Sequence, residues 1–293
     1  MATKIWVGTD AGNEGDWSVA ANWSPSGVPT NGDDVYIENS SQVIDAGLDQ
    51  SAVTLASLNI NQNYTGKIGT TTAYLQIGAT KCDIGYNYGP SANLVGSGRI
   101  KLDLGTAQSY TTILNSAVMA TETSMPPVRI ICNHASTVIE VRKGKVGIAY
   151  ETAETSTLAT VAVSYVTQKT SDADVYIGSG VTLTTLNQTG GDVIMGCGAI
   201  TATCEGGTLL TYGSGAITTL NANGGTITSN STGTITTVNI NGGLVDLTKA
   251  AAPRTVTTLK LNPTGQLKID LDTITVTNGI SSDDPVTMMA NAA

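Results

Sequence analysis

The feature that most constrains the fold of this 293-residue chain is a short phrase repeated along its last third. The phrase is a branched apolar residue, two threonines, a second apolar residue and an asparagine, as in Ile217–Asn221 and Ile235–Asn239. Its first apolar position falls at 183, 200, 217, 235 and 256, where Ile200–Cys204 is a degenerate copy. A period of about 18 residues predicts stacked coils. The widest interval, from 235 to 256, contains 249–253, which we interpret as an inserted loop.

Glycine pairs accompany the phrase with the same period. They stand at Gly190-Gly191, Gly206-Gly207, Gly224-Gly225 and Gly242-Gly243, and an apolar residue follows each pair two positions later. Glycines between short runs rich in Thr, Val and Ile are typical of corners between strands. We therefore predict an all-β fold, a parallel and right-handed β-solenoid with about 17–21 residues per coil in the C-terminal half. Its coils would stack about 4.8 Å apart.

The phrase also predicts where each coil bends. Side chains alternate in direction along a straight strand, so Ile235 and Val238 cannot both face inward unless a corner lies at Thr236-Thr237. Together with the glycine turn, this corner predicts a three-sided cross-section.

The asparagine that ends the phrase suits a tight bend, and its amide can pair with the coil above. We expect a ladder formed by Asn187, Asn221 and Asn239, which Lys260 interrupts.

The chain divides into four segments by the regularity of its repeat. Residues 1–50 form an N-terminal cap or attachment segment, 51–178 hold looser and more widely spaced β runs, 179–280 carry the regular repeat, and 281–293 are a tail. We interpret 51–178 as irregular coils of the same solenoid, with a separate β-sandwich as the alternative. The tail departs from the repeat. Its Val286, Met288 and Met289 are candidates for contact with neighbouring chains.

All three tryptophans, Trp6, Trp17 and Trp23, lie in the first segment. Bulky aromatic residues at this point can cover the apolar edge of the first coil, which no earlier coil protects. The pattern Asn22-Trp23, then Gly27-Val28-Pro29, then Gly32-Asp33-Asp34-Val35 resembles a module at the start of β-solenoid adhesin passengers and phage structural proteins. The resemblance implies a solenoid entrance in which the three tryptophans form a structural cap and a possible attachment site.

Composition excludes several classes of partner. The net charge of −9 and the pI near 4.5 do not suit nucleic acid, because phosphate binding needs clustered Lys and Arg. We expect no membrane span and no signal peptide, since no apolar run is long enough. The four cysteines match no metal motif, so we expect small buried thiols, as in a protein that folds in a reducing cytoplasm.

The sequence contains no recognisable catalytic arrangement, and we predict a protein that is not an enzyme and has no cofactor or metal. The only histidine, His134, has no partner motif and is interpreted as a turn residue. Asn31, Asp33 and Asp34 lack the spacing of a calcium loop and are interpreted as a polar turn. The acids of the regular region take unrelated places in their coils, at Asp192, Glu205, Asp246, Asp270 and Asp272.

An acidic, inert rod of this kind resembles the β-helical structural proteins of phage virions, in particular capsid decoration or cement proteins and head fibres. The resemblance implies a homotrimer that is assembled in the host cytoplasm, binds the major capsid protein and stabilises the head. Two alternatives stay open: a tailspike or fibre that binds polysaccharide, and a cell-surface adhesin passenger domain.

Overall fold

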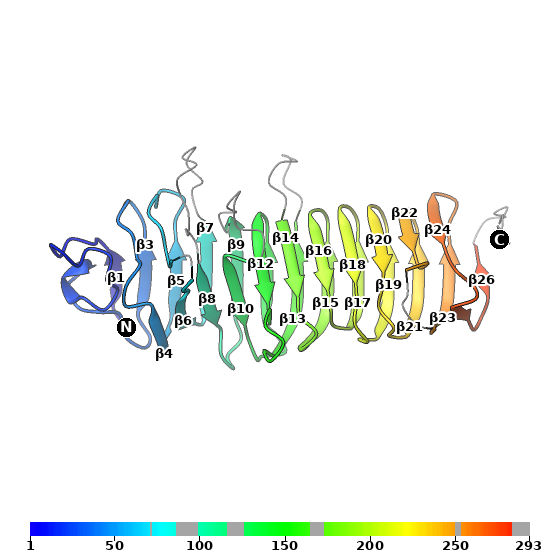
Figure 1. The fold of residues 1–293 in the computed structure, drawn as a ribbon, viewed down its shortest axis with the longest axis horizontal. Helices are drawn as coiled ribbons and strands as arrows, with labels where there is room; N and C mark the ends of the chain where they lie inside the picture. The colour runs from blue at the N-terminus through cyan, green and yellow to red at the C-terminus, as the bar shows by residue number, and fades with distance from the viewer. Residues whose placement is uncertain (71, 86–98, 116–125, 165–172, 250–252, 283–293) are drawn as a thin grey trace.

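The computed structural model describes the whole chain except residues 71, 86–98, 116–125, 165–172, 250–252 and 283–293. The described residues form an elongated rod of stacked coils, with the N-terminus at one end and β26 (Ile280–Ser281) at the other (Figure 1). Two long sheets run along the rod, one of fifteen strands and one of eleven. The predicted all-β, parallel β-solenoid is confirmed, and its right-handed sense stays a prediction.

From β3 to β25, odd-numbered strands lie in one sheet and even-numbered strands in the other, so each coil contributes one strand to each sheet. The fifteen-stranded sheet contains, in spatial order, β2 (Trp23–Ser24), β1 (Thr3–Trp6), β3 (Asp34–Ile37), β5 (Ser57–Ile60), β7 (Lys81–Gly85), β9 (Tyr110–Asn115), β11 (Val138–Val141), β13 (Ser156–Val163), β15 (Val181–Gln188), β17 (Ala199–Cys204), β19 (Ile217–Ala222), β21 (Ile235–Ile240), β23 (Arg254–Leu261) and β25 (Ile274–Val276), with β26 also paired to β23. The eleven-stranded sheet contains β24 (Gly265–Lys268), β22 (Gly243–Asp246), β20 (Thr226–Ser229), β18 (Thr208–Thr211), β16 (Asp192–Met195), β14 (Ala173–Ile177), β12 (Gly144–Ile148), β10 (Val128–Ile131), β8 (Ile100–Asp103), β6 (Leu75–Ala79) and β4 (Asp49–Leu55).

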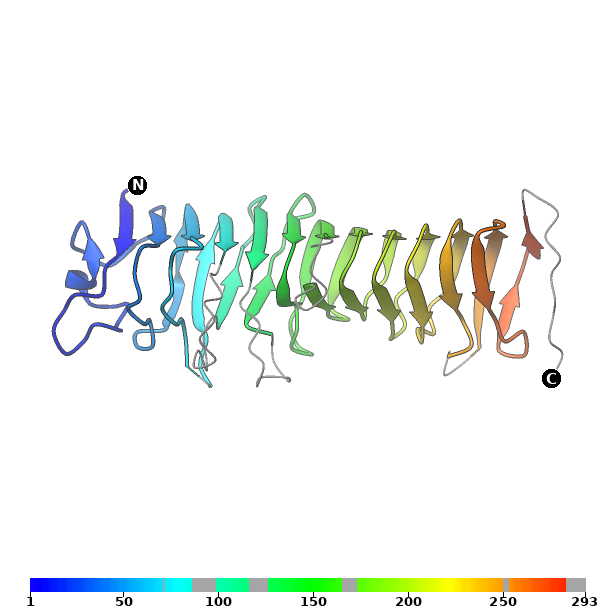
Figure 2. The same cartoon turned by 90° about the horizontal axis from the view of Figure 1, so that it is seen from above.

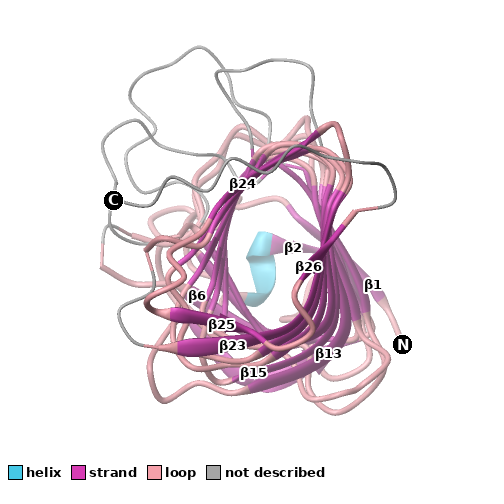
Figure 3. Cartoon of the chain, turned by 90° about the vertical axis from the view of Figure 1, so that its right-hand side faces the viewer, coloured by secondary structure: helices cyan, strands magenta, loops and turns pink. Residues whose placement is uncertain are grey.

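Strands of the fifteen-stranded sheet bend at the predicted corner. In β21, Ile235 and Val238 are both buried, and the pairing with β19 omits Thr236, which is exposed. In the last described coil the bent strand is divided, because β25 pairs with the first part of β23 and β26 with the second. Seen end-on in Figure 3, β25 and β26 lie on adjacent sides and β24 on a third. The cross-section therefore has three sides.

The core consists of inward-facing columns of small and medium apolar residues. One such column, completely buried, is Leu186, Ala202, Leu220, Val238 and Leu259. Because the space between the sheets is narrow, aliphatic side chains fill it without phenylalanine, which the chain lacks.

One coil has a different register from the predicted one. Ala199 pairs with Leu183 and Ile217 and is buried, whereas Ile200 is 57% exposed at the outer corner. The inward column is therefore Leu183, Ala199, Ile217, Ile235 and Val256, and its first interval is the shortest. The prediction that Ile200 starts the degenerate copy was wrong, since two adjacent apolar residues fit the pattern equally well.

Residues 51–178 contribute strands to the same two sheets and do not form a β-sandwich in the part that the structure describes. One column continues in register through this region into the regular one: Val35, Leu58, Cys82, Thr111, Ile139, Val161 and Leu186. Every interval between its members is wider than any interval in the regular region, so these coils are longer. The described strands of this segment are thus continuous with both sheets.

The glycine pairs form the corners between the sheets. The second glycine of a pair takes a left-handed conformation, as at Gly225 with φ of 65° and Gly243 with φ of 67°. The first glycine lies against the coil before it, so that a Cβ atom on Gly224 would be 2.3 Å from the carbonyl oxygen of Glu205. A side chain is disfavoured at both positions, by backbone conformation at one and by contact at the other.

The N-terminal end of the rod is closed by a non-repetitive element. β2 runs antiparallel to β1, and a 3-10 turn, η1 (Ala20–Asn22), precedes it. In Figure 2 this segment lies beyond β3 at the N-terminal end, and in Figure 3 η1 and β2 lie across the middle of the section. The segment therefore covers the end of the core, as the predicted cap requires.

Candidate functional site

The three tryptophans form one cluster inside the cap. Trp23 lies between the other two, with ring centroids 5.1 Å from Trp6 and 4.6 Å from Trp17, both in edge-to-face geometry. Its indole N–H donates to the carbonyl oxygen of Trp17 at 2.8 Å, and that of Trp6 donates to Gln42 at 3.3 Å. All three are at most 2% exposed. Their expected role as a cap fits this burial, but their side chains form no surface for attachment.

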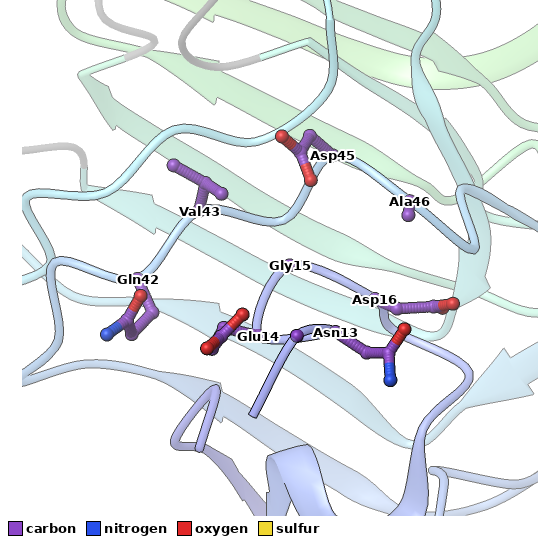
Figure 4. Close-up of a pocket in the computed structure, with 9 residues that line it drawn as sticks. Asn13, Glu14, Gly15, Asp16, Gln42, Val43, Asp45 and Ala46 are labelled. Carbon is purple, nitrogen blue, oxygen red and sulfur yellow. The ribbon is translucent and has the colours of Figure 1, made fainter. Parts of the chain in front are cut away.

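A shallow depression of about 470 Å³ opens beside this cluster, at the junction between the cap and the first coils (Figure 4). Two segments line it. The first runs from Gly12 to Asp16 and the second from Gln42 to Ala46, with Asp45 directed toward the first segment. No aromatic side chain lines the depression, so it offers no platform on which a sugar ring could stack.

Three carboxylates lie around the depression, those of Glu14, Asp16 and Asp45, and the first two interact with backbone N–H groups of their own segment. The Asp16 carboxylate accepts the backbone N–H of Ser18 at 2.8 Å. Backbone N–H groups of Gly12 and of Glu14 itself lower the pKa of the exposed Glu14. Over the described ranges, no group of three or more His, Cys, Asp or Glu side chains could hold a metal ion.

The polar turn near the start of β3 is built as the sequence predicts. Asp33 is buried, and its carboxylate accepts hydrogen bonds from the backbone N–H of Ala2 at 2.7 Å and of Thr30 at 3.0 Å. The Thr30 N–H is the main cause of the lowered pKa of Asp33. Asn31 accepts the Thr54 N–H at 2.8 Å, and Asp34 accepts the Ser57 hydroxyl at 2.6 Å. These oxygens join the first coils to each other.

The predicted asparagine ladder is present in part. Asn239 donates to Asn221 at 2.9 Å, and Asn221 donates to the Thr203 hydroxyl at 3.2 Å. Asn187 lies in the same column, but Thr203 separates it from Asn221. Lys260 follows Asn239 in the column and interrupts the asparagines, as predicted.

A second ladder, which the sequence interpretation missed, lies just beyond the phrase. Asn241 donates to Asn223 at 2.8 Å, and Asn262 donates to Asn241 at 2.7 Å. Its signal was present in the sequence, because Asn223 and Asn241 each stand two positions after a phrase asparagine.

The outer face of the eleven-stranded sheet carries an aromatic stripe that was also missed. The Arg129 guanidinium carbon lies 5.1 Å from the Tyr74 ring centroid and 5.0 Å from that of Tyr150. Tyr150 contacts Tyr176 edge-on at 4.9 Å, and Tyr176 lies 6.1 Å from Tyr212, whose hydroxyl it also contacts. The stripe extends along the rod from Tyr74, directly before β6, to Tyr212, directly after β18.

Most other candidate residues are structural. His134 lies in a turn, where its Nδ1 accepts the Ser136 N–H at 3.1 Å. Cys82, Cys132, Cys197 and Cys204 are free and buried, as expected.

The five acids of the regular region are not brought together as one cluster in the described coils. Asp246 accepts a hydrogen bond from Thr248, and Asp270 accepts hydrogen bonds from Thr273 and Asp272.

The tail residues Val286, Met288 and Met289 lie outside the described residues. None of the described helical structure is long and apolar enough to cross a membrane.

The fold and these surfaces define a β-solenoid protein with a closed N-terminal cap. The chain matches no protein-family model, no curated protein and no solved structure.

Proposed function

We propose that this chain is a non-enzymatic structural protein of a phage virion, a capsid decoration or cement protein that binds and stabilises the head. The observation that carries the proposal is the uninterrupted pair of sheets from the cap to the last described coil. Such a rod has one continuous core and neighbouring coils that support each other, so it resists bending. The entrance pattern around Trp23 supports the virion setting by resemblance.

The proposed mechanism is mechanical reinforcement by many weak contacts. Copies of the rod, associated as homotrimers, would bind the major capsid protein. Because they would bind the assembled shell and not its separated subunits, their binding would stabilise the shell against dissociation. Attachment would use either residues 1–50 or the segment after Ser281. In the first case we propose the surface around the acid-lined depression, because the tryptophans beneath it are buried.

The test uses phage particles assembled without this protein. Adding the purified chain should decorate the shell at regular positions in electron micrographs and raise the temperature at which particles release DNA. A Glu14→Lys and Asp45→Lys double variant tests attachment through the cap, and deletion of 283–293 tests attachment through the tail. Unchanged heat resistance together with undecorated shells would contradict the proposal. A monomer in analytical ultracentrifugation would contradict only the trimer.

The aromatic stripe favours a second candidate, a polysaccharide-binding fibre. The rings of Tyr74, Tyr150, Tyr176 and Tyr212 lie along this stripe, and tyrosine rings provide faces on which sugar rings stack. In this case capsular polysaccharide should bind the purified chain, and Tyr176→Ala should weaken that binding while Thr228→Ala, farther along the same outer column, leaves it unchanged. Release of sugar fragments would indicate an enzyme and contradict both candidates.

A further inference from the structure

A charged side chain is buried inside the rod, and no acidic side chain among the described residues pairs with it. Arg254 opens β23, directly after the inserted segment 249–253, and the residue is 5% exposed. It lies on the inward face, because Val256, two positions later on the same side of the strand, is completely buried. The residues two positions before Ile217 and Ile235, in the preceding coils, are Gly215 and Gly233. The arginine is therefore a departure of this one coil from its neighbours.

The groups that accept hydrogen bonds from the Arg254 guanidinium are uncharged. Its Nη1 donates to the Ser229 hydroxyl at 2.6 Å and to the Ser231 carbonyl oxygen at 2.8 Å. The Ser229 hydroxyl in turn contacts the Thr211 hydroxyl at 2.6 Å, and both residues are completely buried. The residues between Lys249 and Arg254 are alanine and proline, so they contribute no carboxylate.

The other edge of the guanidinium has no partner among the described residues. Both Nε and Nη2 of Arg254 are buried and unpaired. These two atoms share the edge of a guanidinium that donates two parallel N–H bonds to a carboxylate or a similar oxyanion. An arginine keeps its charge in proteins, so a buried guanidinium without an anion is unfavourable. Burial accordingly lowers the pKa of Arg254, and within the described part of the chain no acidic group offsets this effect.

We propose that the Nε–Nη2 edge of Arg254 binds a small planar oxyanion, with a carboxylate as the best fit, in the interior of the rod near Ser229. A planar ion with two oxygens on one side matches both free donors at once. The 5% exposure of the residue favours a small ion from solution over a side chain of another protein. This inference does not depend on the proposed virion function.

The test is thermal unfolding of the full chain as sodium acetate replaces sodium chloride at constant ionic strength. Binding to the folded state alone should raise the Tm of the wild type by roughly 2–4 °C. Arg254→Met keeps an unbranched side chain and removes the charge, so its Tm should not respond to acetate. Arg254→Lys keeps the charge but lacks the two parallel N–H donors, so its Tm should respond much less to acetate. Lys260→Met, on the exposed face of the same strand, removes the same charge and should respond like the wild type.

A crystal grown in bromoacetate gives a direct second measurement, which stays valid if Arg254→Met fails to fold. The bromine should give an anomalous peak next to the Nε–Nη2 edge. A wild type that ignores acetate, an Arg254→Met variant that responds as strongly as the wild type, or a crystal without that peak would each overturn the proposal. A Tm that rises with protein concentration but not with acetate would also overturn it, because the carboxylate would then come from a second copy.

Discussion

The side-chain amide of Asn239 donates a hydrogen bond to the side-chain oxygen of Asn221, 2.9 Å away in the preceding coil. Asn221 also donates to the Thr203 hydroxyl, so it takes part in two hydrogen bonds of the ladder. We expect Asn221→Ala to lower the free energy of unfolding by about 1–2 kcal/mol and Asn239→Ala by about 1 kcal/mol. Asn187→Ala should change it little, because Asn187 is exposed and Thr203 separates it from Asn221. Urea unfolding measures the three effects, and equal losses at all three positions would contradict the ladder.

The core should not tolerate a charge. Val238 is completely buried between neighbouring coils, so Val238→Asp would place an unpaired carboxylate in a narrow apolar space. We expect a loss of more than about 4 kcal/mol and rapid proteolysis of several coils. Ile200→Asp is the matched control. Its side chain lies on the outer corner, so its effect should stay within about 0.5 kcal/mol. Similar losses for the two variants would refute the assigned register at Ala199.

The cap should protect the coils next to it. Trp23 contacts both other tryptophans, and Trp23→Ala should cost about 3–5 kcal/mol through the cavity that it leaves. Because neighbouring coils stabilise each other locally, amide hydrogen exchange should increase first in β1, β3 and β5. Exchange in β19 and β21 should hardly change. A uniform increase in hydrogen exchange along the rod would contradict a local protective role of the cap.

Asp33 should make stability depend on pH in the acidic range. Its pKa is lowered in the folded protein, chiefly by the Thr30 N–H, so the unfolded state binds its proton more readily. The stabilisation is present above the unfolded pKa of about 3.9 and is lost as the pH falls through the lower folded pKa. At pH 7, Asp33→Asn should cost about 1.5–3 kcal/mol, and the difference from the wild type should shrink at lower pH. The exposed Asp192→Asn is the control, and a difference that grows at low pH would contradict this assignment.

The thiols should be unreactive in the folded protein. Burial raises the pKa of Cys204 to about 11 and those of Cys132 and Cys197 to about 12, and it raises the pKa of Cys82 as well. At pH 8 a thiol reagent should therefore modify the native chain much more slowly than the chain in denaturant. Fast labelling of one cysteine in the native state would show that its coil opens.

The repeat made most of the architecture predictable. The period of the Thr-rich phrase indicates the stacked coils, and the three-residue step from Ile235 to Val238 indicates the corner, because both follow from local side-chain direction. The concentration of tryptophans before Val35 indicates the closed end. These features depend on residues close together in the sequence, which is why the sequence alone identifies them.

Features that depend on the length of each coil were not predictable. Ala199 and Ile200 are both apolar, and only a coil slightly shorter than predicted places Ala199 inward. Tyr150, Tyr176 and Tyr212 do not share one register column, since Tyr176 pairs with Gly147 and Ile194, so their ring contacts do not follow from the period. The buried contact between Arg254 and Ser229 likewise depends on how the inserted segment returns to the sheet.

In part of the rod, paired residues of neighbouring coils are separated by the same number of residues in both sheets. This equality determines how the length of the rod can change. Ile217 pairs with Ile235 and Thr226 with Leu244, so both sheets advance by the same length of chain in this stretch. An in-frame loss or duplication of one such unit would rejoin the backbone with both sheets still aligned. The molecule would become shorter or longer by a single strand spacing, about 4.8 Å. The length of the rod can thus change by whole coils. Unequal recombination between repeats would produce such changes and leave the surface of the remaining coils the same.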